Sequence, residues 1–128
     1  MTASNTTPLP ANHQLIRFTA EENPALLEQA LALRWEVFVT EQQVPEDEER
    51  DEYDAEAVHW LVSDATGKPV CTARLVEYQE GCQMKPVAKI GRVATRRDER
   101  GKGLGNLVMR AMLDWAKQEG FDYALLGA

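Results

Sequence analysis

The sequence predicts an α/β fold in which helices flank a single mixed sheet. Segments rich in β-branched and aromatic residues alternate with helical segments, which is the pattern of a sheet covered by helices. The last helical segment has apolar residues at three- and four-residue spacing, so one of its faces must be covered. With 128 residues, the chain is long enough for one core but not for two, and we expect a single domain.

The N-terminal part of the chain is expected to hold a lead-in, then a short strand and a helix. Residues 1–12 are rich in Thr, Ser, Asn and Pro, which predicts a mobile segment before the domain at 13–128. Asn23 and Pro24 form a helix-start signal, because Asn caps a first turn and Pro fits its first position. This helix is expected to extend to about Thr40.

Five strands are expected from β-favouring runs that are bounded by turn residues. They span residues 14–19, 58–63, 69–78, 87–95 and 121–126. Alternation in the third run places Cys71 and Leu75 on one face of the sheet and Arg74 on the other. The fourth run contains Gly91, where a side chain would normally pack, so a β-bulge is expected at this glycine.

The charge of the chain is unevenly distributed. The formal net charge of −7 argues against general nucleic-acid binding, which needs a basic surface. Segment 41–56 holds nine acidic residues and one basic residue, whereas segment 85–102 holds seven basic residues and two acidic ones. A local positive patch on an acidic chain suits a small, highly phosphorylated ligand better than a polymer.

Cysteine content and hydropathy bear on the cellular compartment of the protein and on whether it binds a metal. Cys71 and Cys82 are too few for a disulfide framework, and no Cys or His spacing typical of a zinc site occurs, so we expect no metal. No apolar stretch approaches the length of a membrane span, and the N-terminus lacks the pattern of a secretion signal. We therefore expect a cytoplasmic protein with no membrane partner.

A glycine-rich basic loop separates the fourth expected strand from the last helix. Gly101, Gly103 and Gly105 alternate in this loop, which lets the backbone turn tightly and leaves its N–H groups uncovered. The helix that follows directs its positive dipole end into the loop. A phosphate or pyrophosphate is the expected ligand. Four basic residues in and beside the loop are expected to surround this ligand: Arg96, Arg97, Arg100 and Lys102.

Two other phosphate-binding motifs do not match this loop. A P-loop requires Ser or Thr directly after its lysine, but Lys102 is followed by glycine and leucine. A dinucleotide fingerprint requires an acidic residue at the end of the next strand, and here that strand ends in Leu-Leu-Gly-Ala. An ordinary strand-to-helix turn with solvated arginines is the alternative without a ligand.

The pattern Arg100-x-x-Gly103-x-Gly105 follows a strand that ends in Arg-Val-Ala-Thr, and it closely resembles the acetyl-coenzyme A loop of the GNAT superfamily of N-acetyltransferases. The resemblance covers essentially everything after Asn12 and implies the GNAT-like N-acyltransferase fold, with acetyl-CoA as co-substrate. It implies that strand residues lie beside the pantetheine arm and that loop residues surround the pyrophosphate. The implied cofactor-binding residues are Val93, Ala94, Thr95, Arg100, Gly101, Lys102, Gly103, Leu104 and Gly105.

A second segment, 37–45, has the sequence Val-Phe-Val-Thr-Glu-Gln-Gln-Val-Pro and looks like a bacterial branch of this family with the pattern F-V-x-E-Q-x-V-P. The resemblance implies that this segment faces the group being acetylated. The acidic run that follows, 46–56, would then attract a cationic amine. The alternative for this run is a solvated loop or short helix.

Acetyl transfer to an amine needs a deprotonated nitrogen, a held thioester and donors for the oxyanion that forms. The backbone N–H near Val93 is the expected oxyanion donor, because a bulge at Gly91 frees main-chain groups from the sheet. Glu77 and Glu41 are the candidate general bases, and each is alternatively a surface or structural carboxylate.

The sequence therefore predicts an N-acetyltransferase that moves an acetyl group from acetyl-CoA to a primary amine of a small molecule or peptide. A catalytically silent acyl-CoA-binding or interaction module is the alternative. The family that the chain resembles continues after its fifth strand with another helix and two strands. We therefore expect a chain that is incomplete at its C-terminus, with impaired activity and an open sheet edge that favours a homo-oligomer.

Overall fold

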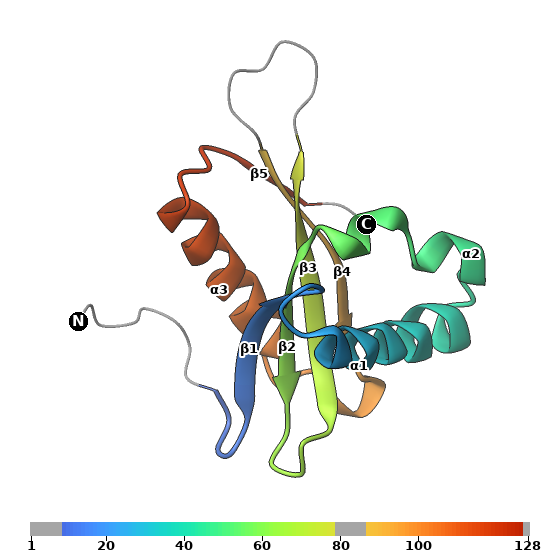
Figure 1. The fold of residues 1–128 in the computed structure, drawn as a ribbon. Coiled ribbons are helices and arrows are strands. Elements are labelled where there is room, and N and C mark those ends of the chain that lie inside the picture. Colours follow the sequence, from blue (N-terminus) through green and yellow to red (C-terminus); the bar gives the residue numbers. More distant parts are fainter. Residues whose placement is uncertain (1–8, 79–86, 127–128) are drawn as a thin grey trace.

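The structure is a computed structural model that describes residues 9–78 and 87–126 (Figure 1). Most of the expected lead-in lies outside the described residues, as does Cys82. Within the lead-in, Leu9 packs against the core.

The described residues form one five-stranded mixed sheet with the strand order β1-β2-β3-β4-β5. The strands are β1 (Gln14–Thr19), β2 (Val58–Ser63), β3 (Pro69–Tyr78), β4 (Val87–Thr95) and β5 (Ala124–Leu126). The first four pair antiparallel with their neighbours, and β5 pairs parallel with β4. The predicted fold class is confirmed, and the bounds of the first four strands agree with the expected ones. β5 is shorter than expected, because Phe121 packs against Trp115, with 6.4 Å between ring centroids, before the strand begins.

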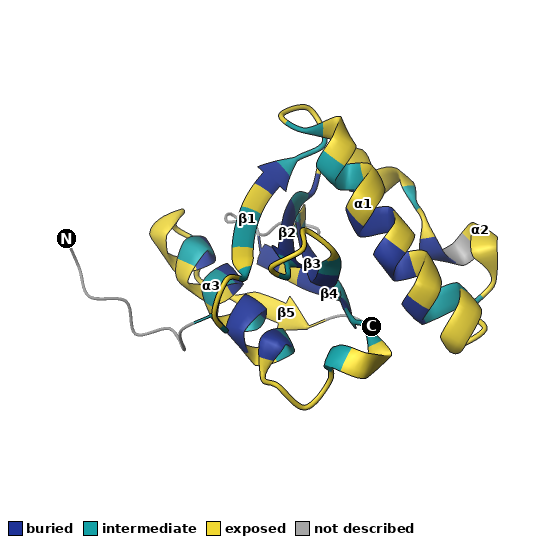
Figure 2. Ribbon diagram, turned by 90° about the horizontal axis from the view of Figure 1, so that it is seen from below, coloured by how far each residue is buried: buried dark blue, intermediate teal, exposed yellow. Residues whose placement is uncertain are grey.

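Helices cover both faces of this sheet, as Figures 1 and 2 show. One face carries α1 (Pro24–Arg34), its continuation η1 (Trp35–Glu41) and the short helices α2 (Glu46–Glu49) and η2 (Glu52–Ala55). The other face carries α3 (Leu104–Gln118), which follows the 3₁₀ turn η3 (Arg97–Glu99). The sheet is therefore the middle layer of three.

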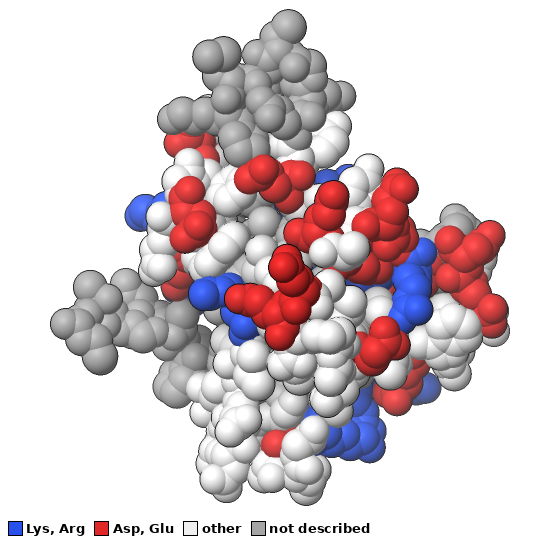
Figure 3. All heavy atoms as spheres, in the orientation of Figure 1, with Lys and Arg blue, Asp and Glu red and all other residues white. Residues whose placement is uncertain are grey.

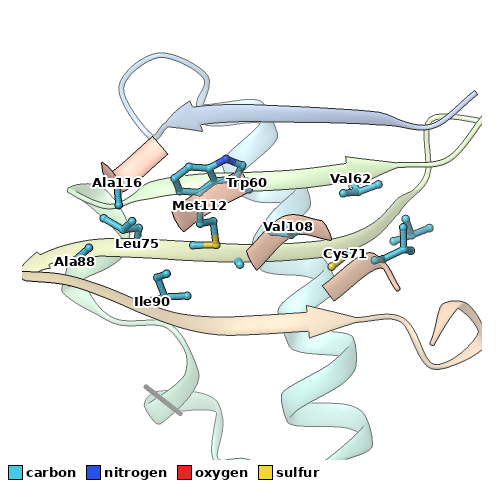
Figure 4. Packing of buried hydrophobic residues seen from close by; sticks show 12 residues of the cluster. Trp60, Val62, Cys71, Leu75, Ala88, Ile90, Val108, Met112 and Ala116 are labelled. Carbon is cyan, nitrogen blue, oxygen red and sulfur yellow. The ribbon is translucent and has the colours of Figure 1, made fainter. Parts of the chain in front are cut away.

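Each face of the sheet has its own apolar cluster. Figure 4 shows the cluster under α3, in which Met112 and Val108 of the helix pack against β2, β3 and β4. The predicted apolar stripe of this helix is confirmed by its buried residues Leu104, Leu107, Val108, Met112 and Ala116. The cluster under α1 contains the buried residues Phe18, Ala30, Leu33, Val37, Leu61 and Ala94.

The start of α1 agrees with the sequence signal. The Leu26 amide donates to Asn23 Oδ1 at 3.1 Å, and Pro24 occupies the first helical position. From Trp35 to Glu41 the helix widens into a π-helix, and the Gln42 amide donates to Val37 O at 3.1 Å. The expected end of the helix is confirmed, but its last seven residues have a wider turn than the spacing of apolar residues could predict.

The β-bulge in β4 lies beyond Gly91 rather than at it. Thr72 pairs with Ala94 and Arg74 with Gly91, so two steps along β3 correspond to three along β4. The residue with a positive φ, at +52°, is Arg92. The expected position was wrong because Gly91 keeps an ordinary pairing, and an arginine adopts the left-handed conformation instead.

Candidate active site

The loop between β4 and α3 exposes the first amides of the helix. Gly101 and Gly103 have positive φ values of +84° and +79°, which favour glycine. Gly103 precedes the first turn of α3 and makes no side-chain cap. The early N–H groups of α3, at the positive end of its dipole, are therefore not covered by a capping side chain.

Gly105 differs from the other two glycines of the loop because its backbone does not require glycine. An added Cβ would lie 3.8 Å from Thr95 Oγ1, which is an ordinary van der Waals distance. Among the described residues, no contact explains this glycine. A ligand that approaches the first turn of α3 closely would explain it.

Arg100 joins the loop to the end of η1. Its Nε donates to Thr95 O at 2.9 Å, and its two terminal nitrogens bind both oxygens of Glu41 at 2.5 and 2.7 Å. The hydrogen bond from Arg100 lowers the pKa of the Glu41 carboxyl, and the same contact raises the pKa of Arg100. The structure thus brings together two residues for which the sequence suggested separate roles.

The edge of β4 beside this loop is open within the part of the chain that the structure describes. β5 pairs with β4 only from Ala88 to Ile90. The Arg96 amide donates to Val70 O at 2.9 Å on the β3 side, and alternate amides of a strand point to opposite sides. The N–H groups of Val93 and Thr95 are therefore directed toward the open edge, away from β3.

Arg92 and Val93 direct their side chains to different faces of the sheet, as consecutive residues of a strand do. Arg92 lies on the α1 side, where its Nε donates to Glu49 O at 3.1 Å and its Nη2 donates to Asp51 Oδ2 at 3.1 Å. Val93 packs against the cluster under α3. The expected oxyanion donor, Val93, therefore directly follows a residue whose side chain contacts the α2–η2 segment.

A network of three arginines and three carboxylates lies on the α1 side of the sheet, and we call it the ion cluster. Its members are Arg34, Glu49, Asp51, Asp54, Arg74 and Arg92. Arg34 is 1% exposed; it bonds the Glu49 carboxylate, and its Nη1 lies 2.6 Å from Asp54 Oδ1. Arg74 bonds Asp51 at 2.6 and 2.8 Å and Asp54 at 2.8 Å.

The ion cluster changes the interpretation of the acidic run 46–56. The alternative of a short helix is confirmed, because the run forms α2 and η2. Exposed acids such as Glu46 and Glu52 remain, and Figure 3 shows acidic side chains on the face that carries α2. Glu49 and Asp54 are buried, however, and paired with Arg34. Burial alone would raise the pKa of Asp54, but the hydrogen bonds and charge of Arg34 outweigh it and lower the pKa to about 2. These two acids are neither solvated nor available to attract an amine.

A cavity of about 370 Å³ lies between the ion cluster and the strands β3 and β4. It is lined by Asp51, Tyr53, Arg74, Val76, Tyr78, Lys89, Gly91 and Arg92. Gly91 and Arg92 directly precede Val93, so the cavity adjoins the bulge. No pattern in the sequence predicted this site, because its lining comes from separate segments of the chain.

Glu77 lies away from the loop. It is exposed near the end of β3 and pairs with Ala88, which is seven positions before Thr95 and thus about 20 Å away along the strand. It lines a different cavity, on the α3 side, together with Trp115 and Phe121. The structure does not bring Glu77 together with the other candidate site residues.

A comparison with protein-family models matches residues 27–127 to the acetyltransferase (GNAT) family. The chain belongs to this family. The GNAT chain is 34% identical over 107 residues to the protein named "Uncharacterized N-acetyltransferase YjcF" of Bacillus subtilis, covering 84% of this chain and 71% of that protein. It is 40% identical to "UPF0039 protein Rv2851c" of Mycobacterium tuberculosis over 88 residues, and these residues make up 68% of this chain. The match spans about half, 55%, of that relative's length.

Solved structures show the same fold. The crystal structure of Escherichia coli ElaA matches this GNAT chain with a TM-score of 0.78 and 26% identity, over 91% of this chain and 78% of ElaA. The aminoglycoside N-acetyltransferase AAC(6')-Iy, solved in complex with CoA, matches with a TM-score of 0.64 and 15% identity, over 95% of this chain and 80% of that one. This second likeness concerns the fold alone.

The described residues contain neither a helix that could cross a membrane nor a group of side chains arranged to hold a metal ion. No helix there combines the length and the apolar character needed to cross a membrane. No group of three or more His, Cys, Asp or Glu side chains in that part of the chain is arranged to hold a metal ion.

Proposed function

We propose that this GNAT chain carries the coenzyme site of an N-acetyltransferase that moves an acetyl group from acetyl-CoA to a primary amine. The observation that carries this proposal is the uncapped N-terminus of α3 next to an open edge of β4. Loop amides at 101–105 would bind the pyrophosphate, because helix N-termini favour anions. The likeness to a structure that contains CoA supports the choice of ligand.

The proposed reaction requires the chain to hold the thioester and to stabilise its oxyanion. The N–H groups of Val93 and Thr95, directed toward the open edge, would bind the extended pantetheine arm. The amine nitrogen attacks the thioester carbonyl carbon, and a C–N bond forms as the C–S bond breaks. The nitrogen loses one proton and the departing thiolate gains one, so the reaction is balanced. The Val93 N–H would donate to the carbonyl oxygen as its negative charge develops.

Arg100 and Glu41 act in this proposal as positioning residues. Both oxygens of Glu41 accept from Arg100, which lowers the pKa of Glu41 and leaves this carboxylate poorly suited to take a proton from the amine. Their ion pair connects η1 to the pyrophosphate loop. Glu77, about 20 Å along the sheet from Thr95, has no part in the proposed chemistry.

Calorimetric titration with acetyl-CoA tests the proposed site. Gly103→Ala places a side chain at φ +79°, which should distort the loop and weaken binding about tenfold or more. Gly120→Ala is the matched control, because it has a similar φ of +91° at the opposite end of α3 and should leave the affinity unchanged. Arg100→Ala should weaken binding by loosening the loop. Undiminished affinity in both Gly103→Ala and Arg100→Ala would contradict the proposal.

A silent acyl-CoA-binding module is the second candidate function. The observation that favours it is the placement of the two candidate bases, one engaged by Arg100 and one far from the loop. An assay of free thiol release with a panel of primary amines separates the two candidates. Binding of acetyl-CoA without turnover of any amine would favour the module.

A further inference from the structure

The cavity beside the β4 bulge has a charge opposite to the one that the acidic sequence around it suggests. Gly91 and Arg92 form part of its wall, and the next residue is Val93, the proposed oxyanion donor. A group bound in this cavity would therefore lie close to the carbonyl of a thioester held at Val93. The inference below rests on the proposed function, because it concerns the acceptor at that same site.

The carboxylates around the cavity are already engaged by arginines. Both oxygens of Asp51 accept from Arg74, at 2.6 and 2.8 Å, and Oδ2 also accepts from Arg92. Burial alone would raise the pKa of Asp51, but the hydrogen bonds from Arg74 outweigh it and lower the pKa. In the ion cluster the three carboxylates equal the three guanidinium groups in number, so their formal charges cancel.

Lys89 adds a positive charge to this otherwise balanced wall. It lies two residues before Gly91 on β4, so strand alternation places both on the face that lines the cavity. Its Nζ lies 5.7 Å from the centre of the Tyr78 ring. Among the described residues, no carboxylate lies within ion-pair distance of Lys89. The described lining of the cavity therefore has a net positive charge.

The remaining wall suits a small organic skeleton. Tyr53, which is 48% exposed, and Tyr78 present aromatic surfaces, and Val76 adds an aliphatic one. A volume of about 370 Å³ is in the range of small-molecule sites. Apolar walls that surround one fixed charge orient a ligand that has an apolar body and one opposite charge.

We propose that the acceptor is an amine that also carries a carboxylate, of the amino-acid type, and that Lys89 determines this specificity by binding the carboxylate. Pairing with Lys89 would hold the carboxylate in the cavity and leave the amino group to reach toward Val93. Polycationic amines are disfavoured, because the described wall would repel them and offers no carboxylate without an arginine partner.

Matched acceptors test this proposal on the full chain. L-Leucine and L-phenylalanine are compared with their carboxamides, which keep the amine and the side chain but lack the negative charge, and with spermidine. A peptide that begins with aspartate and ends in an amide tests whether a peptide-borne carboxylate is accepted as well as a free amino acid. We expect kcat/KM for the amino acids to exceed that for the carboxamides by about tenfold or more, the effect of one charge-assisted hydrogen bond.

Variants of Lys89 assign that preference to one side chain. Lys89→Gln should remove the preference for the carboxylate, and Lys89→Glu should reverse it in favour of the carboxamides. Lys117→Glu makes the same charge change on the exposed surface of α3 and should retain the preference. Acetyl-CoA affinity should be unchanged in all three variants, which separates this proposal from the proposed coenzyme site.

The outcomes that overturn the proposal are also distinct. Equal or better turnover of carboxamides or spermidine by the unaltered chain would contradict it, as would a preference that survives in Lys89→Glu. If no amine is turned over, NMR titrations compare the binding of leucine with that of leucinamide. Equal binding of the two, or no binding of either, would overturn the proposal. Failure to bind acetyl-CoA, together with a carboxylate preference that depends on Lys89, would overturn the proposed function alone.

Discussion

The pyrophosphate loop and the ion cluster are both rich in charge, but they are built in different ways. The loop is a contiguous stretch, 96–105, and its proposed ligand groups are backbone amides arranged by glycines at positive φ. In the ion cluster, each arginine lies 15 to 43 residues away in the sequence from the groups to which it donates. Residues 100–103 of the loop are exposed, whereas Arg34, Glu49 and Asp54 are buried.

This difference determines what each region contributes. A loop built from exposed backbone can be altered with little effect on the core, so changes there should act mainly on ligand binding. A buried network of charges is costly to disrupt, because any group that loses its partner remains buried and unpaired. Changes to its buried members Arg34, Glu49 and Asp54 should therefore act first on stability and only through it on function.

Removal of Arg34 is expected to have the largest effect. Arg34→Ala leaves Glu49 and Asp54 with fewer partners, and loss of one side of a buried ion pair destabilises by about 3–5 kcal/mol. Urea unfolding followed by tryptophan fluorescence measures the free energy of unfolding. Arg50→Ala is the control, since its pair with Glu28 at 3.3 Å is largely exposed and should contribute less than about 1 kcal/mol. Similar losses in the two variants would contradict the expectation that the buried ion cluster is costlier to disrupt than an exposed ion pair.

Acid should weaken the ion cluster within a defined pH range. The folded pKa of Asp54, about 2, lies below its ordinary value of 3.8, so the unfolded chain takes up the proton first. This stabilising contribution is complete above pH 4 and is lost as the pH falls toward 2, a change of about 2 kcal/mol in the free energy of unfolding. Urea titrations at successive pH values measure the loss, and Asp54→Asn should show a smaller one. NMR measures the pKa of the Asp54 carboxyl in the folded chain. A value of 3.8 or higher would contradict this expectation.

The sequence predicted those features that depend on local patterns. Strand alternation, the start of α1 at Asn23 and the stripe under α3 follow from the spacing of neighbouring residues, and the structure confirms them. The turn at Gly101 and Gly103 could also be identified, because both have a positive φ, which favours glycine.

The features that were missed depend on distant contacts. The positive φ of Arg92 is accompanied by its bonds to Glu49 O and Asp51, which are more than 40 residues earlier in the chain. The acidic run alone could not indicate which carboxylates meet Arg34 and Arg74. The run 46–56 holds eight acids and a single arginine, whereas Arg34, Arg74 and Arg92 lie on a helix and on strands. This imbalance of charge is the one signal that points to such pairing.

The smallest effects are expected for the two carboxylates that the sequence suggested as general bases. Substituting them tests whether either one takes the proton from the amine or whether Glu41 only holds the loop in place. Glu41→Gln keeps the shape of the side chain but weakens its pair with Arg100, which is 39% exposed at its side chain, so acetyl-CoA affinity should fall only about two- to fivefold. Glu77→Gln should change neither affinity nor turnover. Titration with acetyl-CoA measures the affinity of each variant. The pH dependence of kcat with the best acceptor measures its turnover. A general base contributes about 10²-fold or more, so a loss of kcat that large in either variant would restore that carboxylate as the base. A modest rise in Kd in Glu41→Gln, with kcat and its pH profile unchanged, would assign Glu41 to the support of the loop.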